Sequence, residues 1–262
     1  MNKVTALWLS KGPALAGLLR VSTLPRFDPR VESAGGMNPR KPFLGLLQWR
    51  QCIVPTWRGW LALLVVIGVA GTVVIRSLYG FLAVNDPLPG GILVIEGWSP
   101  DYVIEGALND FRKSHYGQIC LTGGPIEFGN AMREHKTYAE YAKAMCLKLG
   151  VPAEALHAIP APPAERDRSY ASALALREWL RDHGAADAKI NIAGNGAHSR
   201  RTRLVYEKAL GAGRRIGISN VEEINFDPKR WWTSSFGFRV VLDETIAYIY
   251  ARLFFSPPKP QP

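Results

Sequence analysis

The sequence contains few of the residues that build metal and redox centres. Only three of its 262 residues are cysteines, and Cys52, Cys120 and Cys146 form neither a CxxC pair nor a metal-ligand spacing. The pattern therefore predicts no metal site and leaves any cofactor unknown. Because Cys120 falls in a predicted buried strand and Cys146 in a predicted helix, we interpret both as small buried hydrophobic residues. A disulfide between them is the alternative that the sequence leaves open.

Two nucleotide-binding signatures are also missing. The paired glycines Gly123 and Gly124 lack the remaining residues of both the Walker A loop and the GxGxxG fingerprint. Their absence argues against ordinary P-loop or dinucleotide chemistry. Apolar residues make up 47% of the chain, which is too little for a transporter with many spans and suits one globular domain with a single membrane span.

Positive charge is plentiful but unevenly distributed. Residues 1–58 hold nine Lys and Arg against two acidic residues, whereas residues 77–262 hold 22 basic and 20 acidic residues. The near-neutral remainder has no basic stripe interleaved with aromatic residues, so the composition argues against a nucleic-acid partner. A basic segment before an apolar one is typical of a tail that stays on the cytoplasmic face of a membrane.

The longest uncharged run is the 17 residues of Gly59–Ile75, and the apolar character continues after Arg76 to Val84. A helix needs about 20 residues to cross the ~30 Å hydrocarbon layer. We therefore predict one transmembrane helix at residues 59–83 with its N-terminus in the cytoplasm. The long basic tail disfavours a cleaved signal peptide. The lack of a polar face disfavours a buried core helix. The excess of Lys and Arg before the segment disfavours the reverse orientation.

The remaining segments follow from composition. Residues 1–58 form the predicted basic tail. We interpret residues 1–36 either as a disordered tail or as the result of a translation start assigned too early, in which case Met37 begins a shorter protein. Residues 84–91 contain two prolines and two glycines and are a linker. We assign residues 92–236 to the main domain and residues 237–262 to an aromatic C-terminal helix and a Pro-rich tail.

Short apolar runs alternate with helical patterns along the main domain. The predicted strands are Ile92–Ile95, Gln118–Leu121, Leu156–Ile159, Lys189–Ala193 and Arg215–Ser219. The predicted helices start at Ser99–Asp101, with Ser99 as N-cap, and continue at about 130–149, about 168–183, Ser199–Leu210 and about 238–255. This alternation predicts an α/β fold, a Rossmann-like parallel sheet with helices on both faces, preceded by one N-terminal transmembrane helix.

Ligands of such sheets bind beside the carboxyl ends of the strands. Four predicted loops lie there: Glu96–Ser99, Thr122–Phe128, Pro160–Tyr170 and Gly194–Arg201. In the first loop Glu96 directly follows a buried strand, which suits catalysis or ligand binding, and capping of the next helix is an equally good interpretation.

The second loop carries the glycine pair. Gly123 and Gly124 permit close approach of a ligand to backbone N–H groups that can hold an anion, and a plain turn is the alternative. Lys136 is expected early in the following helix, where its charge favours the same anion.

The third loop places Asp167, Arg168 and Ser169 at a helix start. Arg168 suits phosphate or carboxylate binding, and Asp167 or Ser169 suits capping of the helix, whereas the alternative is a solvated charged loop. The fourth loop places His198 after a buried strand, with Arg201 one helical turn later. We interpret His198 as an acid, base or hydrogen-bond donor beside an anion held by Arg201. The alternative is a solvated basic helix face.

These loops, in this order, resemble the ElyC/SanA/YdcF family, also called domain of unknown function 218. The resemblance covers about residues 90–220 and rests on ILVIEGW, LTGGP, EHKTYAEYA, DRSYASALALREWL and AHSRRTRLVYEKALG. The last segment is similar to the family's His-x-x-Arg element, which matches His198 and Arg201. Gly123 and Gly124 match its second Gly-Gly. The chain departs from the family at Glu96-Gly97-Trp98, where many members have paired glycines.

The resemblance implies a Rossmann-like domain, frequently anchored in the bacterial inner membrane with the domain in the periplasm, and a link to envelope biogenesis. Two functions compete. An enzyme would hold the phosphate of a phosphorylated or lipid-linked saccharide through Arg168, Arg201 and the glycine pair, with Ser169 beside them, while His198 moves a proton and Glu96 or Asp167 orients a water or a metal. A non-enzymatic module would only bind such a ligand or support a complex.

The aromatic C-terminal helix has two interpretations of its own. It lies on the membrane or docks a partner, or it covers the sheet edge as part of the core. We expect the second arrangement because most apolar helices of a domain are buried.

Overall fold

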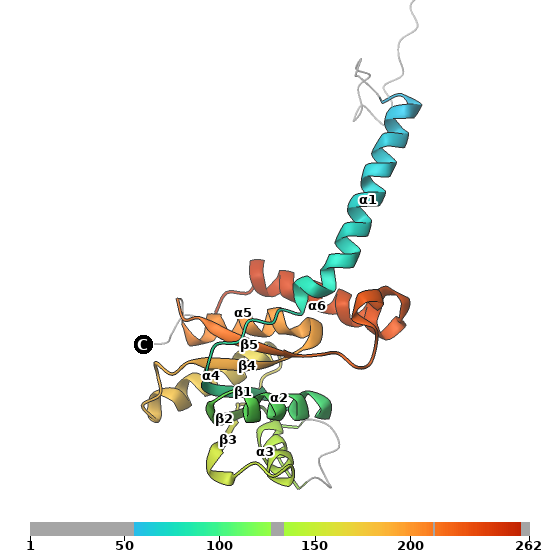
Figure 1. Ribbon diagram of the computed structural model, residues 1–262. Coiled ribbons are helices and arrows are strands. Elements are labelled where there is room, and N and C mark those ends of the chain that lie inside the picture. The colour runs from blue at the N-terminus through green and yellow to red at the C-terminus, as the bar shows by residue number, and fades with distance from the viewer. Residues whose placement is uncertain (1–54, 127–133, 212, 258–262) are drawn as a thin grey trace, which may run out of the picture. The chain divides into compact units, whose positions relative to one another are not determined.

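The computed structural model describes residues 55–126, 134–211 and 213–257. Predictions for the basic tail, Met37 and Cys52 lie outside these residues. The domain is built on a five-stranded, all-parallel sheet with the strand order β3-β2-β1-β4-β5 (Figure 1). The strands are β1 (Gly91–Glu96), β2 (Tyr116–Gly123), β3 (Leu156–Pro160), β4 (Ile190–Asn195) and β5 (Ile216–Val221). The predicted strands of β1, β2 and β3 lie within the observed ones, and those of β4 and β5 begin one residue too early, at Lys189 and Arg215.

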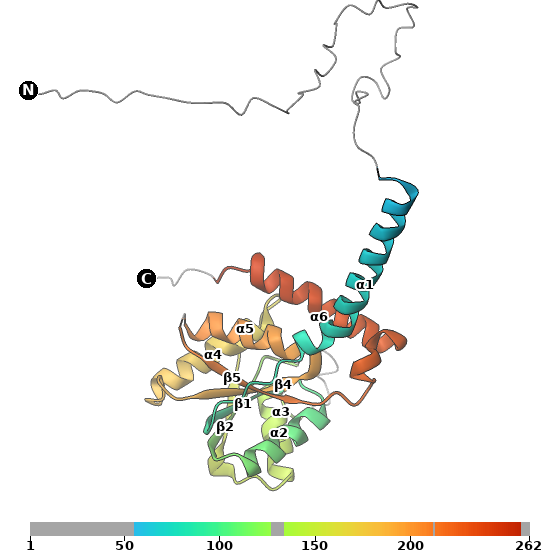
Figure 2. The same cartoon turned by 45° about the horizontal axis from the view of Figure 1, so that its top comes forward.

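Helices cover both faces of the sheet, as predicted for an α/β fold. The helices are α1 (Trp57–Leu82), α2 (Asp101–Lys113), α3 (Tyr138–Lys148), α4 (Arg168–Asp182), α5 (Ser199–Leu210) and α6 (Ser235–Leu253), with short 3₁₀ turns η3 (Ala153–Ala155), η4 (Gly196–His198) and η5 (Pro228–Thr233). The helices α2 and α3 pack on one face, and α4 and α5 pack on the other (Figure 2).

Side chains on the two faces of the sheet form two separate hydrophobic cores. Cys120 of β2 lies in the core beneath α4 and α5, whereas Cys146 of α3 lies in the core on the opposite face. Both are buried free thiols, so the disulfide alternative does not hold. Burial raises the pKa of the Cys120 thiol to about 12 and that of Cys146 to about 11.

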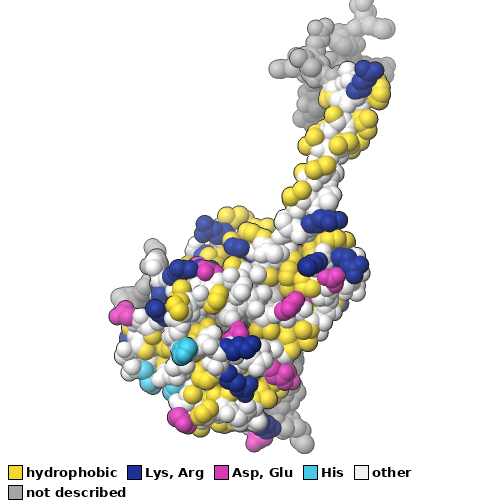
Figure 3. Space-filling view, in the orientation of Figure 1, with side chains coloured by type: hydrophobic (Ala, Val, Ile, Leu, Met, Phe, Trp, Pro, Cys, Tyr) yellow, Lys and Arg dark blue, Asp and Glu magenta, His cyan; other side chains and the backbone are white. Residues whose placement is uncertain are grey.

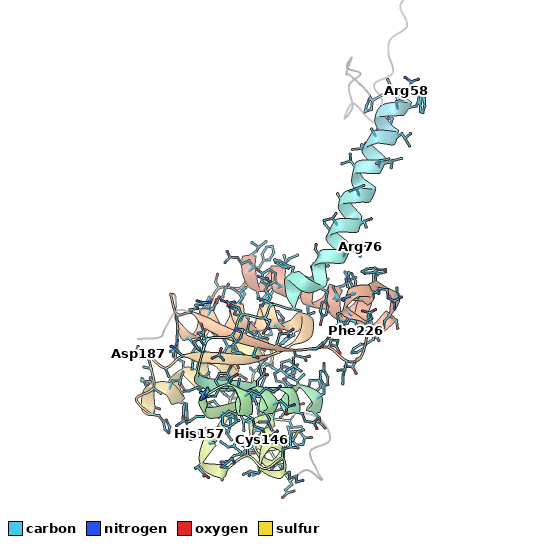
Figure 4. All side chains as sticks on the ribbon, viewed as in Figure 1. Arg58, Arg76, Cys146, His157, Asp187 and Phe226 are labelled. Atoms are coloured by element: carbon cyan, nitrogen blue, oxygen red, sulfur yellow. The ribbon has the colours of Figure 1, made fainter. Side chains whose placement is uncertain are left out.

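The segment predicted at residues 59–83 is the helix α1, which is long and apolar enough to cross a membrane by its length and composition. Arg58 and Arg76 bracket its uncharged stretch (Figure 4). Its final turns join the domain through a third apolar cluster, in which Leu82 is fully buried beside Trp231 and Val241. Thus one end of α1 belongs to the domain's packing, while its central residues are exposed.

Two helix starts differ from the predictions. Pro100, not Ser99, occupies the N-cap position of α2, and Ser99 is a buried turn residue whose N–H donates to the carbonyl of Glu96. Helix α3 begins at Tyr138 rather than near residue 130, because Thr137 and Glu140 form a capping box that marks its first turn. Lys136 therefore lies before the helix, not within it.

The expectation for the C-terminal helix is wrong. Helix α6 packs mainly on η5, α5 and the end of α1, rather than covering an edge strand of the sheet. The ring contact between Phe81 and Tyr248 joins α6 to α1, and Phe255, two residues after the end of α6, contacts Tyr170 of α4. An apolar periodicity indicates that a helix face is covered, but it does not tell which neighbour covers it.

Candidate functional site

The strand order creates a natural binding position between β1 and β4. The chain leaves β1 toward β2 and β3 and then returns to β4 on the other side of β1, so the carboxyl ends of these central strands diverge. A cleft of about 740 Å³ opens there. All four loops that the sequence singled out contribute to its wall, and α6 adds a further side.

His198 lies at the floor of this cleft with its imidazole between two carboxylates. Its Nδ1 is 2.9 Å from Glu244 Oε1, and its Nε2 is 3.5 Å from Glu96 Oε2. The Trp98 ring meets the imidazole edge to face at 4.9 Å between centroids. Burial by itself lowers the pKa of His198, but the nearby carboxylates of Glu244 and Glu96 outweigh it and raise that pKa.

Arg201 and Glu244 form the outer part of the same cluster. Arg201 donates from Nε to Glu244 Oε2 at 2.8 Å and from Nη2 to Oε1 at 3.1 Å. Arg201 Nη2 is also 2.8 Å from His198 Nδ1. We assign a proton to Nδ1 because the carboxylate can only accept. Burial favours a neutral Glu244, yet hydrogen bonds from His198 and Arg201 lower its pKa to about 2.

Two buried polar atoms beside the carboxyl ends of β1 and β4 have no hydrogen-bond partner, and of their two residues only His198 is among those that line the cleft. The two atoms are Glu96 Oε1 and His198 Nε2, and their residues are only 2% and 8% exposed. Thr202 reaches the other oxygen of Glu96, with Oγ1 donating at 3.5 Å. An unpaired buried polar atom costs about 1–3 kcal/mol, so such atoms are rare and are satisfied by whatever binds beside them. Glu96 and His198 therefore have the geometry of a pair that receives a bound group.

A second polar network lines the same cleft and was not foreseen from the sequence. Tyr102 donates its hydroxyl toward Asn195 Oδ1 at 3.1 Å and Glu223 Oε1 at 3.3 Å. Asn225 donates to the same Glu223 oxygen from its backbone and side chain, each at 2.8 Å. Burial and the charge of Glu223 raise the pKa of Tyr102, so its hydroxyl stays protonated and acts as a donor.

The third loop contributes Asp167, Arg168 and Ser169 to the cleft wall. Asp167 has a left-handed backbone with φ of 54°, the only non-glycine residue with positive φ among those described. It stands at the N-cap position of α4, but its side chain makes no capping hydrogen bond. A non-glycine residue in this conformation is strained by about 1–3 kcal/mol, and such strain is often found at binding sites.

Gly123 and Gly124 occupy different environments. Gly124 lines the cleft, whereas a Cβ on Gly123 would lie 2.7 Å from Tyr138 Cβ. A Cβ on Gly97 would collide with the backbone of the same Tyr138. Because Gly97 and Gly123 have no side chain, Tyr138, the first residue of α3, can pack closely against the strand ends. Lys136 is exposed in front of α3, and neither it nor Gly123 is among the residues that line the cleft.

Glu244 is the most important residue that sequence reasoning missed. It lies on α6, far in the sequence from any strand end, and it reaches both His198 and Arg201. The available signal was a carboxylate within the apolar and aromatic stretch FRVVLDETIAYIY. Among the described residues, no group of three or more His, Cys, Asp or Glu side chains could hold a metal ion.

Comparisons of the chain with protein-family models, curated proteins and solved structures found no match. The likeness to the ElyC/SanA/YdcF family therefore stays a prediction from the motifs.

Proposed function

We propose that this protein is a membrane-anchored enzyme of the bacterial cell envelope that transfers or hydrolyses a phosphoryl group on a lipid-linked saccharide. The observation that carries the proposal is the contact between Glu96 and His198: each holds an unpartnered buried atom, and His198 lines the cleft at the switch point of the sheet. A buried histidine whose pKa is shifted, in a cleft of this kind, is typical of catalytic sites.

The proposed step divides two proton transfers between these residues. Glu96 takes a proton from water or from an acceptor hydroxyl, whose oxygen then forms a new bond to phosphorus. The bond from phosphorus to the leaving oxygen breaks, and His198 gives its Nε2 proton to that oxygen. The 3.5 Å between Glu96 Oε2 and His198 Nε2 allows the proton to return and restore both groups.

Glu244 and Arg201 are positioning residues in this scheme. Glu244 accepts from His198 Nδ1, which keeps the opposite Nε2 proton directed toward the cleft and stabilises the imidazolium. Arg201 donates two hydrogen bonds to Glu244, so the positive charge of Arg201 is largely neutralised by that carboxylate. Recognition of the phosphoryl group accordingly falls on His198 itself, with Arg168 and Ser169 in the neighbouring wall.

The proposed location is the inner membrane, with the N-terminus in the cytoplasm and the domain in the periplasm. Its support is the excess of Lys and Arg before α1 and the suitability of α1 as a span. A cysteine placed at exposed Glu105 of α2 is expected to react with a membrane-impermeant maleimide in intact spheroplasts. A cysteine in the tail, at Lys11, is expected to react only after lysis. The opposite pattern contradicts the orientation.

A non-enzymatic binding module is the second candidate. It is favoured by the aromatic wall of the cleft, to which Trp98, Tyr102 and Tyr170 contribute, and by a volume within the range of ordinary small-molecule sites. In that case the cluster around His198 would orient a ligand without turning it over.

One experiment separates the two candidates. The full chain, purified in detergent, is incubated with undecaprenyl phosphate, undecaprenyl diphosphate and sugar-linked forms of both, and binding and released phosphate are measured. An enzyme turns over at least one of them, and Glu96→Gln and His198→Gln lower the turnover by about 10²–10⁴-fold. His115→Gln, on an exposed turn, is the matched control. Binding with no product favours the module, and unchanged turnover in His198→Gln overturns the mechanism.

A further inference from the structure

Helix α6 is apolar on two opposite faces, and only one of them is covered. Its packed face includes the buried residues Gly237, Val241 and Ala251. The opposite face carries an exposed row, which we call the α6 stripe: Phe238, Leu242, Ile246, Ile249 and Leu253. At one end of this row Phe238 also stacks on Trp231, with 6.0 Å between the ring centroids. The spacing of three or four residues between the members of the stripe puts them on one side of the helix. Each is between 36% and 71% exposed, and Phe254 extends the row at 72%.

We propose that the α6 stripe lies in the interfacial layer of a lipid bilayer, parallel to the membrane surface. The inference rests on the proposed anchoring by α1, and its partner is the lipid surface itself. A row of this length is unusual on a solvent-facing helix, because contiguous exposed apolar patches mark contact with a membrane or a partner. Helices that lie in the membrane interface bury an exposed apolar face about 5–10 Å into the headgroup boundary.

The contacts between α1 and α6 set the depth of the stripe. If about 20 residues from Trp57 onward cross the hydrocarbon layer, the crossing ends near Arg76. The rest of α1, up to Leu82, then lies in the headgroup layer. The contacts with the domain begin at this boundary and continue beyond it: Trp231 donates its indole N–H to the Ile75 carbonyl at 3.0 Å, and Phe81 contacts Tyr248 of α6. Helix α6 is therefore attached to α1 at headgroup depth.

The arrangement of the helices gives the stripe its direction. The packed face of α6 rests on α5, and α6 lies on the side of the domain from which α1 emerges, as both ribbon views show (Figures 1 and 2). The stripe, opposite the packed face, is thus directed along α1 and toward the bilayer. Hydrophobic side chains mixed with Lys and Arg gather around the base of α1 (Figure 3).

Charges around the stripe suit anionic headgroups. Arg239 and Arg252 are exposed on α6, and Arg76 is exposed on α1, with Asp243 as the exposed acid of α6. Basic residues at this depth are attracted to anionic lipids, each by a modest amount that salt screens.

The same helix also forms a wall of the cleft. Phe236 and Tyr250 line the cleft and are 44% and 48% exposed. Their helical spacing places them between the packed face of α6 and the stripe. With the stripe in the interfacial layer, the cleft opens beside the membrane surface. A substrate with a lipid tail then reaches His198 without leaving the bilayer.

Nitroxide labels on the full chain in vesicles of phosphatidylethanolamine and phosphatidylglycerol test the inference. Only Cys52 needs replacement, because Cys120 and Cys146 are buried. Labels are placed at Ile246 and Leu253 of the stripe, at Val66 in the middle of α1, and at exposed Glu105 of α2 as the aqueous control. Collisions with oxygen, which concentrates in lipid, and with a water-soluble nickel complex are measured for each label.

The expected result is that Val66 and both stripe labels collide more with oxygen, whereas Glu105 collides more with nickel. Stripe labels that behave like Glu105 while Val66 stays in lipid overturn the inference and leave the anchor intact. A Val66 label exposed to nickel overturns the anchor itself. Stripe labels shielded from both reagents, with spin–spin broadening that disappears on dilution with unlabelled protein, mean that a second copy covers the stripe, and this result also overturns the inference.

Discussion

His198 Nδ1 lies 2.9 Å from Glu244 Oε1, although 46 positions separate the two residues in the sequence. The imidazole comes from the turn after β4, and the carboxylate comes from α6, which packs outside the sheet on α5. The last helix of the domain thus completes a site that begins at the strand ends. Its position determines both the orientation and the protonation of the imidazole.

Removing the charge of Glu244 is expected to lower the pKa of His198. In Glu244→Gln the imidazolium loses its closest anionic partner, while burial and the Arg201 charge still disfavour the protonated form. The same variant also deprives Arg201 of its carboxylate partner, which lowers the free energy of unfolding by about 1–3 kcal/mol. NMR titration of the His198 ring and denaturant unfolding measure the two effects. Asp243→Asn, at the exposed neighbour, is the control, and an unchanged pKa in Glu244→Gln contradicts the assignment.

The His198–Glu244 pair is expected to stabilise the fold most between about pH 4.5 and 6.5. The pKa of His198 is raised above 6.5, so its contribution is complete below pH 6.5 and is lost as the pH rises through the folded value. The pKa of Glu244 is lowered from 4.5 to about 2, so its contribution is present above pH 4.5 and is lost as the pH falls toward 2.

This pH window is measured by comparing the unfolding free energy of the natural protein with that of His198→Gln from pH 4 to 9. The difference between them is expected to be largest near pH 5–6 and to shrink in alkaline solution. A difference that grows as the pH rises would show that His198 is neutral in the folded protein.

Adding a methyl group at Gly97 is expected to disturb the start of α3. A Cβ there collides with the backbone of Tyr138, which can move only if the helix moves. Gly97→Ala should lower the free energy of unfolding by about 1–3 kcal/mol, as overpacking usually does. Gly117→Ala is the matched control, because no atom lies within 4 Å of a Cβ at that position of β2. Equal stability of the two variants would contradict the steric role of Gly97.

Truncating Leu82 is expected to loosen α1 from the domain. Leu82 is fully buried beside Trp231 and Val241, so Leu82→Ala removes packing at the base of α1 and costs about 2–5 kcal/mol. The measurement is the rate of limited proteolysis in the linker at residues 84–90, together with the thermal midpoint in detergent. Leu64→Ala, exposed in the middle of α1, should leave both unchanged. If Leu64→Ala also speeds cleavage of the linker, the faster cleavage comes from a change in α1 and not from lost packing at Leu82.

Local patterns were enough to predict most elements of the fold. Helix α5 spans Ser199–Leu210, as predicted, and the strand cores lie where continuous apolar runs stand between turn residues. Strands covered on both faces must be apolar throughout, so each run is visible without knowledge of its neighbours. The start of α3 was also encoded locally, since Thr137 and Glu140 form a capping box whose signal was overlooked.

The sequence by itself determined the α/β alternation, the apolar segment that becomes α1, and the loops that contain Glu96 and His198. Tertiary structure decided which charges meet there, since Glu244 reaches His198 only after α6 has packed on α5. It also decided which face of α6 is covered, because a helix that is apolar on both sides has no periodicity to mark its buried face. Contacts between distant segments depend on how whole elements pack, and no local pattern records that choice.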